Sequence, residues 1–92
     1  MIKKLQKIIE QHIQITKQIS KPEIISNISR YKQLAREEKH LSNITPKAKL
    51  YIKKHKQLKD DETILLGEDT ELKELVKDEI GPLKDEIAKM EE

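Results

Sequence analysis

The sequence predicts an all-α protein: a long antiparallel helical hairpin with an additional N-terminal helix packed on it. The first reason is composition, because Lys, Glu, Leu, Ile and Gln dominate and all but Ile are strong helix formers. The second is periodicity, because apolar residues recur at three- and four-residue steps along most of the chain. The third is that no segment shows the alternating pattern of a strand. Three main helices are expected.

Length and composition limit the architecture. The 92 residues allow at most one domain, which we expect to span residues 1–92. The chain is 35% hydrophobic and 39% charged, too polar for a thick core but sufficient for long helices that share a narrow apolar stripe. Regular spacing of the apolar residues argues against full disorder. Without cysteine there is no disulfide or thiolate metal site, which fits a cytoplasmic protein.

The first predicted helix covers residues 2–19. Its expected apolar stripe comprises Ile2, Leu5, Ile9, Ile13 and Thr16, with Ile8, Ile15 and Ile19 beside it. The stretch Ser20-Lys21-Pro22 ends this helix, because proline disrupts a helix interior. The next helix can begin near Pro22 or at the capping residues Ser26 and Asn27.

The second predicted helix is a long path that ends before Gly67. Its expected stripe comprises Ile28, Tyr31, Leu34, Glu38, Leu41, Ile44, Ala48, Tyr51, His55, Leu58 and Leu65. The spacing keeps its phase across Thr45-Pro46. We therefore expect one helical path that is kinked or briefly broken there, with Thr45 able to cap the resumed segment.

The third predicted helix starts at Asp69, a good N-cap, with Glu71 near its positive end. Its expected stripe comprises Leu72, Leu75, Val76, Ile80, Leu83, Ile87 and Met90. Gly81-Pro82 should bend this helix. The short turn after Gly67 favours an antiparallel hairpin of the second and third helices.

Charge is distributed unevenly. Residues 1–59 carry 15 Lys/Arg and 4 Asp/Glu, whereas residues 60–92 carry 4 Lys and 13 Asp/Glu. Folding back would place a basic arm beside an acidic one, and one interpretation of the acidic helix is an internal counter-charge. In heptad phase Lys49, Lys53 and Lys56 point away from the stripe, and they are candidate contacts for RNA phosphates. The competing interpretation is a solvated helix face.

No constellation of catalytic residues is recognisable. His12, His40 and His55 do not share a helix turn with one another, and paired carboxylates are typical of solvated helix faces. Two glycines cannot form a phosphate-cradling loop. We expect no enzymatic activity, no metal, no cofactor and no small-molecule substrate. No stretch approaches a membrane span, and the basic N-terminal helix is expected to pack on the hairpin rather than lie on a membrane.

Two segments carry a family resemblance: RYKQLAREEKHLSNI at residues 30–44 and DTELKELVKDEI at residues 69–80. They resemble the amino-terminal domain of bacterial class-I peptide chain release factors. In that family one helix carries an aromatic residue, Leu, a Glu-rich turn and another Leu. A later helix opens with Asp, Glu and an aliphatic residue and continues to an acidic pair. The matching residues here are Tyr31, Leu34, Glu37, Glu38 and Leu41, and then Asp69, Glu71, Leu72, Leu75, Asp78, Glu79 and Ile80.

The resemblance implies a function in translation termination. Complete release factors read a stop codon and use a Gly-Gly-Gln motif to trigger peptidyl-tRNA hydrolysis, and neither motif occurs in this sequence. We therefore expect an isolated, non-catalytic amino-terminal domain. The resemblance implies contact with the stalk-base protein and rRNA of the large ribosomal subunit, with the GTPase release factor that recycles class-I factors, or with both. The alternative is a stand-alone coiled-coil adaptor or dimerisation module with a similar Leu/Glu pattern.

Overall fold

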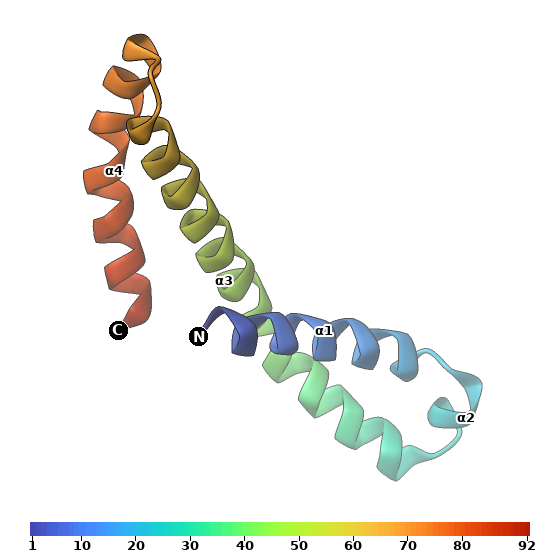
Figure 1. Cartoon of the computed structure of the whole chain (residues 1–92). Coiled ribbons are helices and arrows are strands. Elements are labelled where there is room, and N and C mark those ends of the chain that lie inside the picture. The colour runs from blue at the N-terminus through green and yellow to red at the C-terminus, as the bar shows by residue number, and fades with distance from the viewer. The chain divides into compact units, whose positions relative to one another are not determined.

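The computed structural model describes all residues from 1 to 92. It contains four helices and no strand: α1 (Ile2–Ile19), α2 (Pro22–Ile25), α3 (Ile28–Leu66) and α4 (Thr70–Glu91) (Figure 1). The predicted all-α class with three main helices is confirmed. The chain forms two compact units, residues 1–49 and residues 50–92, and α3 contributes to both.

In the first unit, local signals place the ends of the helices. Helix α1 stops at Ile19, immediately before the Ser20-Lys21-Pro22 stretch that predicts its end. Both predicted starts of the next helix are used, because the short α2 begins at Pro22 and α3 begins at Ile28. The side chain of Asn27 caps α3 by accepting a hydrogen bond of 3.2 Å from the backbone N–H of Arg30.

Helix α1 lies antiparallel to the first part of α3. His12 contacts Glu38, and Ile19 lines the same surface depression as Tyr31, so positions that advance along α1 recede along α3. The buried residues of this unit are Leu34, Leu41, Thr45 and Ala48, all on α3. No residue of α1 is fully buried, and its packed face is half-buried.

The packed face of α1 differs from the predicted stripe. Leu5, Ile8, Ile9 and Ile15 are half-buried as expected, but Ile13 and Thr16 are exposed. His12 takes the place expected for Ile13 on the packed face. Isoleucines occur around most of the circumference of α1, so periodicity alone could not choose between neighbouring faces.

The helices continue through both internal prolines. Helix α3 is uninterrupted at Pro46, and α4 is uninterrupted at Gly81-Pro82. Each proline side chain is exposed, so water can bind the carbonyl oxygen that loses its helical partner four residues earlier. The brief break allowed for at Pro46 is therefore absent. Thr45 is not an N-cap but a buried residue within the helix.

In the second unit, α3 and α4 form the predicted antiparallel hairpin (Figure 1). Helix α3 stops at Leu66, and the N–H of Gly67 donates to the carbonyl of Ile64 over 3.0 Å. The predicted cap at Asp69 is present, because its carboxylate accepts a 3.1 Å hydrogen bond from the N–H of Leu72. Glu71 lies in the first turn of α4, where a negative charge is favourable.

The core of the second unit consists of Tyr51, Val76, Leu83 and Ile87, together with the carboxylate of Asp61. The predicted stripe of α4 is wrong at two residues, because Leu72 is 43% exposed and Leu75 is 66% exposed. On α3 the buried position after Leu58 is Asp61 rather than an apolar residue, and Leu65 is exposed. A straight helix has about 3.6 residues per turn, slightly more than a heptad repeat assumes. The residues that face the partner helix therefore depart from the heptad positions toward the helix end.

Each unit is stabilised by a short list of buried side chains. A fully buried aliphatic or aromatic side chain contributes roughly 1.5–3 kcal/mol. Leu34, at 1% exposure, is the most completely buried of them. No helix combines the length and the apolar character needed to cross a membrane.

Candidate functional site

The three candidate lysines lie on α3, and all are exposed. Lys49 is the last residue of the first unit, and Lys53 and Lys56 belong to the second. Their orientation away from the packed stripe agrees with the prediction. Exposure of a positive charge is necessary for binding a phosphate group, but it is not evidence of binding. Their contact with RNA remains a prediction.

The second unit contains one lysine–carboxylate ion pair. Lys54 donates to Glu86 across the hairpin, and the Lys54 side chain is 23% exposed. Lys53 and Lys56 form no ion pair with the acidic helix. The idea that α4 is an internal counter-charge therefore holds for Lys54 and leaves the charges of Lys53 and Lys56 available to a partner.

Tyr51 anchors the open end of this hairpin. Its ring stands edge-on to the imidazole of His55, with centroids 4.5 Å apart and an angle of 61° between the planes. Burial raises the pKa of the Tyr51 phenol above its usual 10.0. The carboxylate of Glu91 raises this pKa further, through its negative charge and by accepting a hydrogen bond. These contacts indicate a packing role for Tyr51 and His55.

Two buried polar atoms in the second unit have no hydrogen-bond partner. They are Oδ2 of Asp61 and Nε2 of His55. Buried polar groups usually find partners, because leaving one unsatisfied costs roughly 1–3 kcal/mol. No group of three or more His, Asp or Glu side chains is placed to hold a metal ion. Asp61 and His55 therefore do not form part of a recognisable ligand set.

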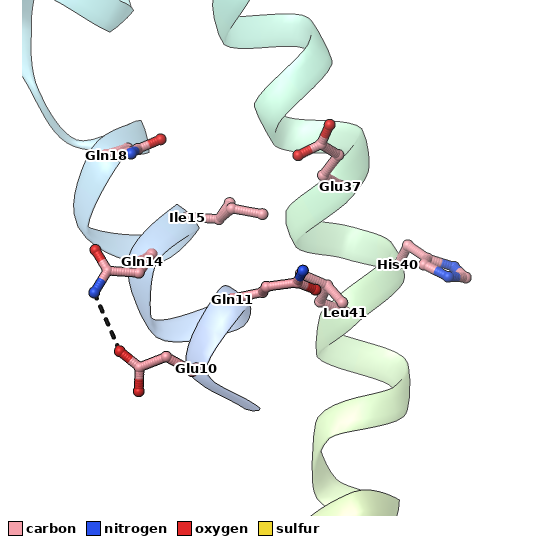
Figure 2. Close-up of a pocket in the computed structure, with 8 residues that line it drawn as sticks. All are labelled: Glu10, Gln11, Gln14, Ile15, Gln18, Glu37, His40 and Leu41. Carbon is pink, nitrogen blue, oxygen red and sulfur yellow. Dashed lines mark hydrogen bonds between the residues drawn. The ribbon is translucent and has the colours of Figure 1, made fainter. Parts of the chain in front are cut away.

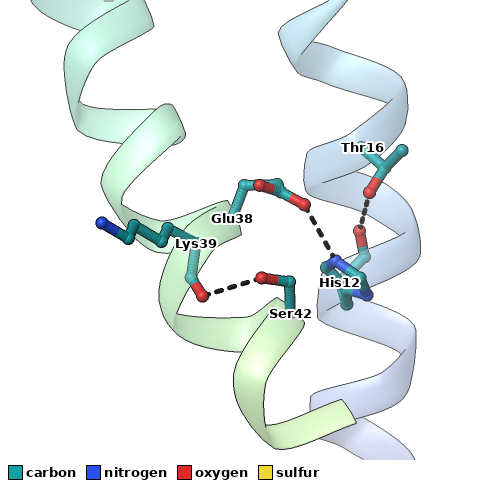
Figure 3. A network of polar contacts seen from close by, with 5 residues as sticks. All are labelled: His12, Thr16, Glu38, Lys39 and Ser42. Atoms are coloured by element: carbon teal, nitrogen blue, oxygen red, sulfur yellow. Dashed lines mark hydrogen bonds and ion pairs between the residues drawn. The ribbon is translucent and has the colours of Figure 1, made fainter. Parts of the chain in front are cut away.

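In the first unit, the polar contacts between α1 and α3 centre on His12. Its Nε2 lies 3.2 Å from Oε1 of Glu38 (Figure 3). The hydroxyls of Thr16 and Ser42 donate to backbone carbonyls of their own helices, those of His12 and Lys39, at 2.8 and 2.9 Å. Only the His12–Glu38 contact joins the two helices, and it can fix their register.

A shallow groove lies beside this contact, between α1 and α3 (Figure 2). Most of its lining residues are polar, and one hydrogen bond within it joins the Gln14 amide to Glu10 over 3.2 Å. Figure 2 shows the Ile15 side chain directed from α1 toward α3. The lining residues are Glu10, Gln11, Gln14, Ile15, Gln18, Glu37, His40 and Leu41. The groove contains no nucleophile paired with a base.

One apolar surface of the second unit was not predicted from the sequence. Leu66 is 88% exposed and Leu75 is 66% exposed, on the two sides of the α3–α4 turn. Leu75 fits a helical stripe and was therefore expected inside. The signal that could have revealed this surface is the dense acidic sequence around both leucines.

Comparison with known proteins identifies the family of this chain. The profile of the PCRF domain family matches residues 8–92. Peptide chain release factor 1 of Sulfurovum sp. (strain NBC37-1) is 34% identical over 97% of this chain, which covers 24% of that protein. The same factor of Syntrophomonas wolfei is 31% identical over the whole chain and 26% of its own length. That of Caldicellulosiruptor saccharolyticus is 34% identical over 94% of the chain and 24% of its own length.

The chain thus spans about a quarter of the length of these curated relatives. No solved structure matches it. The match includes both segments, residues 30–44 and 69–80, on which the resemblance to release factors rests. The resemblance is confirmed over nearly the whole chain, and the protein belongs to the PCRF domain family.

Proposed function

We propose that this chain is a non-catalytic domain of a translation termination factor and that it acts in the cytoplasm as a ribosome-binding module. Its partners would be the protein and rRNA of the large-subunit stalk base, the recycling GTPase release factor, or both. The observation that carries the proposal is the match of residues 8–92 to the PCRF domain, together with relatives that are named peptide chain release factor 1.

The exposed lysines of α3 supply a physical basis for rRNA contact. Lys53 and Lys56 carry no internal ion pair, and Lys49 is likewise exposed. A lysine that neutralises an RNA phosphate releases condensed counterions, so its contribution to affinity falls as salt rises. The backbone of a helix fixes the spacing of these lysines along α3.

The proposal is tested by cosedimentation of the chain with purified large ribosomal subunits at several salt concentrations. The test variant changes Lys49, Lys53 and Lys56 together to Glu. The matched control changes three exposed lysines of α4 to Glu, namely Lys77, Lys84 and Lys89, so it has the same net charge as the test variant. We expect the test variant to bind at least about tenfold more weakly. Its plot of the logarithm of affinity against the logarithm of salt concentration should also be shallower, with a slope smaller in magnitude by about three. The control should retain most of the affinity.

Equal binding by the test variant and the wild type would remove this face of α3 as the contact. Equal weakening by both variants would show a response to net charge alone. Absence of binding by the wild type would contradict a ribosome-binding module. It would then favour the alternative of a coiled-coil adaptor, whose apolar association is insensitive to salt and appears as a dimer in light scattering.

A further inference from the structure

Four exposed leucines surround the α3–α4 turn of the second unit. Leu65 and Leu66 end α3, and Leu72 and Leu75 lie in the first two turns of α4. Their exposed fractions are 38%, 88%, 43% and 66% in chain order. A single exposed leucine needs no explanation, but four around one short turn form a feature typical of an interaction site. We call these four residues the leucine surface.

The leucine surface lies in the most acidic part of the chain. Residues 60–79 contain nine carboxylates and two lysines, a net charge of −7. All of the carboxylates except Asp61 are exposed. A shallow, open depression on α4 is lined by Leu75 together with Thr70, Glu71, Glu74 and Asp78, so the leucine and three carboxylates border the same space.

We infer that the leucine surface binds a basic segment of another protein, one that combines lysines or arginines with aliphatic anchors. Aliphatic anchors would cover the leucines, while the surrounding carboxylates would pair with the cations at the rim of the contact. The negative field attracts such a segment and speeds its association. The same field repels the phosphates of nucleic acids and of anionic membranes.

This inference does not rest on the ribosomal function proposed above, because it uses different residues of opposite charge. A second copy of the chain is the competing occupant, since Ile25, Ile28 and Tyr31 are exposed in the first unit. Residues 17–32 around them hold four cations and one carboxylate. That excess of three positive charges balances fewer than half of the seven excess negative charges around the leucine surface. Charge complementarity therefore favours a more basic partner.

The test is fluorescence anisotropy of the purified chain with labelled model peptides. The probe is an amphipathic helix of roughly 18 residues with a leucine face and a lysine face. A second peptide has the same lysines with serine in place of leucine, and a third has glutamate in place of lysine. We expect the Leu/Lys peptide to bind best, with an affinity that decreases as salt increases.

The variant L66S/L75S should bind the Leu/Lys peptide at least about tenfold more weakly. Both leucines are exposed, so circular dichroism should show an unchanged fold. The matched control is L50S/I13S, which removes two exposed apolar side chains elsewhere. A second pair compares E71Q/E74Q, beside Leu75, with D85N/E92Q at the other end of α4. Only the first member of that pair should weaken binding.

Several results would overturn the inference. One is a Leu/Lys peptide that does not bind, or that binds L66S/L75S as well as it binds the wild type. Another is equal affinity for the Lys/Ser peptide, which would reduce the contact to charge alone. The last such result would come from light scattering. If the molar mass of the wild type grows with concentration and that of L66S/L75S does not, a second copy of the chain occupies the leucine surface by a head-to-tail contact.

Discussion

The two units differ in how their outer helices are anchored. Helix α4 of the second unit contributes three buried residues, Val76, Leu83 and Ile87, and an ion pair to α3. Helix α1 of the first unit contributes none that is fully buried and one imidazole–carboxylate contact. Both helices are amphipathic and face α3, so amphipathic spacing alone does not reveal how deeply a helix is held.

The largest expected effect comes from the buried end of α4. Ile87→Ala should lower the free energy of unfolding of the second unit by about 2–5 kcal/mol, because it leaves a cavity at a site that is 4% exposed. Ile15→Ala, on the half-buried face of α1, should lower the free energy of unfolding of the first unit by about 1–2 kcal/mol. Amide hydrogen exchange resolves the two helices, and Leu66→Ala is the control, with a change within about 0.5 kcal/mol. Equal costs for Ile87→Ala and Ile15→Ala would contradict the difference in anchoring.

Replacing a buried, unpaired polar group should raise the free energy of unfolding, by less than the cavity at Ile87 lowers it. Two such sites on α3 are Thr45 in the first unit and Asp61 in the second. Asp61→Leu should stabilise the second unit by about 1–2 kcal/mol, because it removes a buried carboxylate. Thr45→Val keeps the shape and should stabilise the first unit by about 0.5–1 kcal/mol. Melting curves followed by circular dichroism measure both, and a destabilised Asp61→Leu would indicate a role for its carboxylate.

The smallest effect should be confined to alkaline pH and to the second unit. The pKa of Tyr51 is raised above 10.0 in the folded protein, mainly by burial and further by Glu91. The folded state therefore holds the phenol proton more tightly, and its contribution to stability is complete below pH 10. It is lost as the pH rises from about 10 through the folded-state pKa.

The stability of the wild type should thus fall more steeply above pH 10 than that of Tyr51→Phe, measured by urea unfolding at several pH values. Tyr31→Phe, at an exposed tyrosine of the first unit, is the control and should follow the wild type. Identical alkaline slopes for the wild type and Tyr51→Phe would exclude Tyr51 as the source of the pH dependence.

Local chemistry made the helix ends predictable. Asp69 caps α4 because a carboxylate can accept a hydrogen bond from the third residue of a helix, and Pro22 starts α2 because its fixed φ suits a first turn. The orientation of the helices was less predictable. Leu75 and Val76 are adjacent apolar residues, and only the position of α3 decides that Val76 is buried and Leu75 is exposed.

The candidate site was predictable to a similar extent. The exposure of Lys53 and Lys56 followed from their distance from the stripe, which is a property of the helix itself. The burial of Asp61 could not be predicted in this way, because the heptad phase predicts Leu65 as the next contact after Leu58. Sequence spacing could not reveal the leucine surface either, since leucines at helical intervals normally predict a core.

The short connections between the helices have a consequence for folding kinetics. In each unit the packed helices are neighbours in sequence, joined by α2 or by the turn of residues 67–69. Closing such small loops costs little entropy, and proteins dominated by local contacts fold in microseconds to milliseconds. All residues of the first unit precede α4 in the chain. During synthesis the first unit can therefore complete its packing before the helix that closes the second unit has been made.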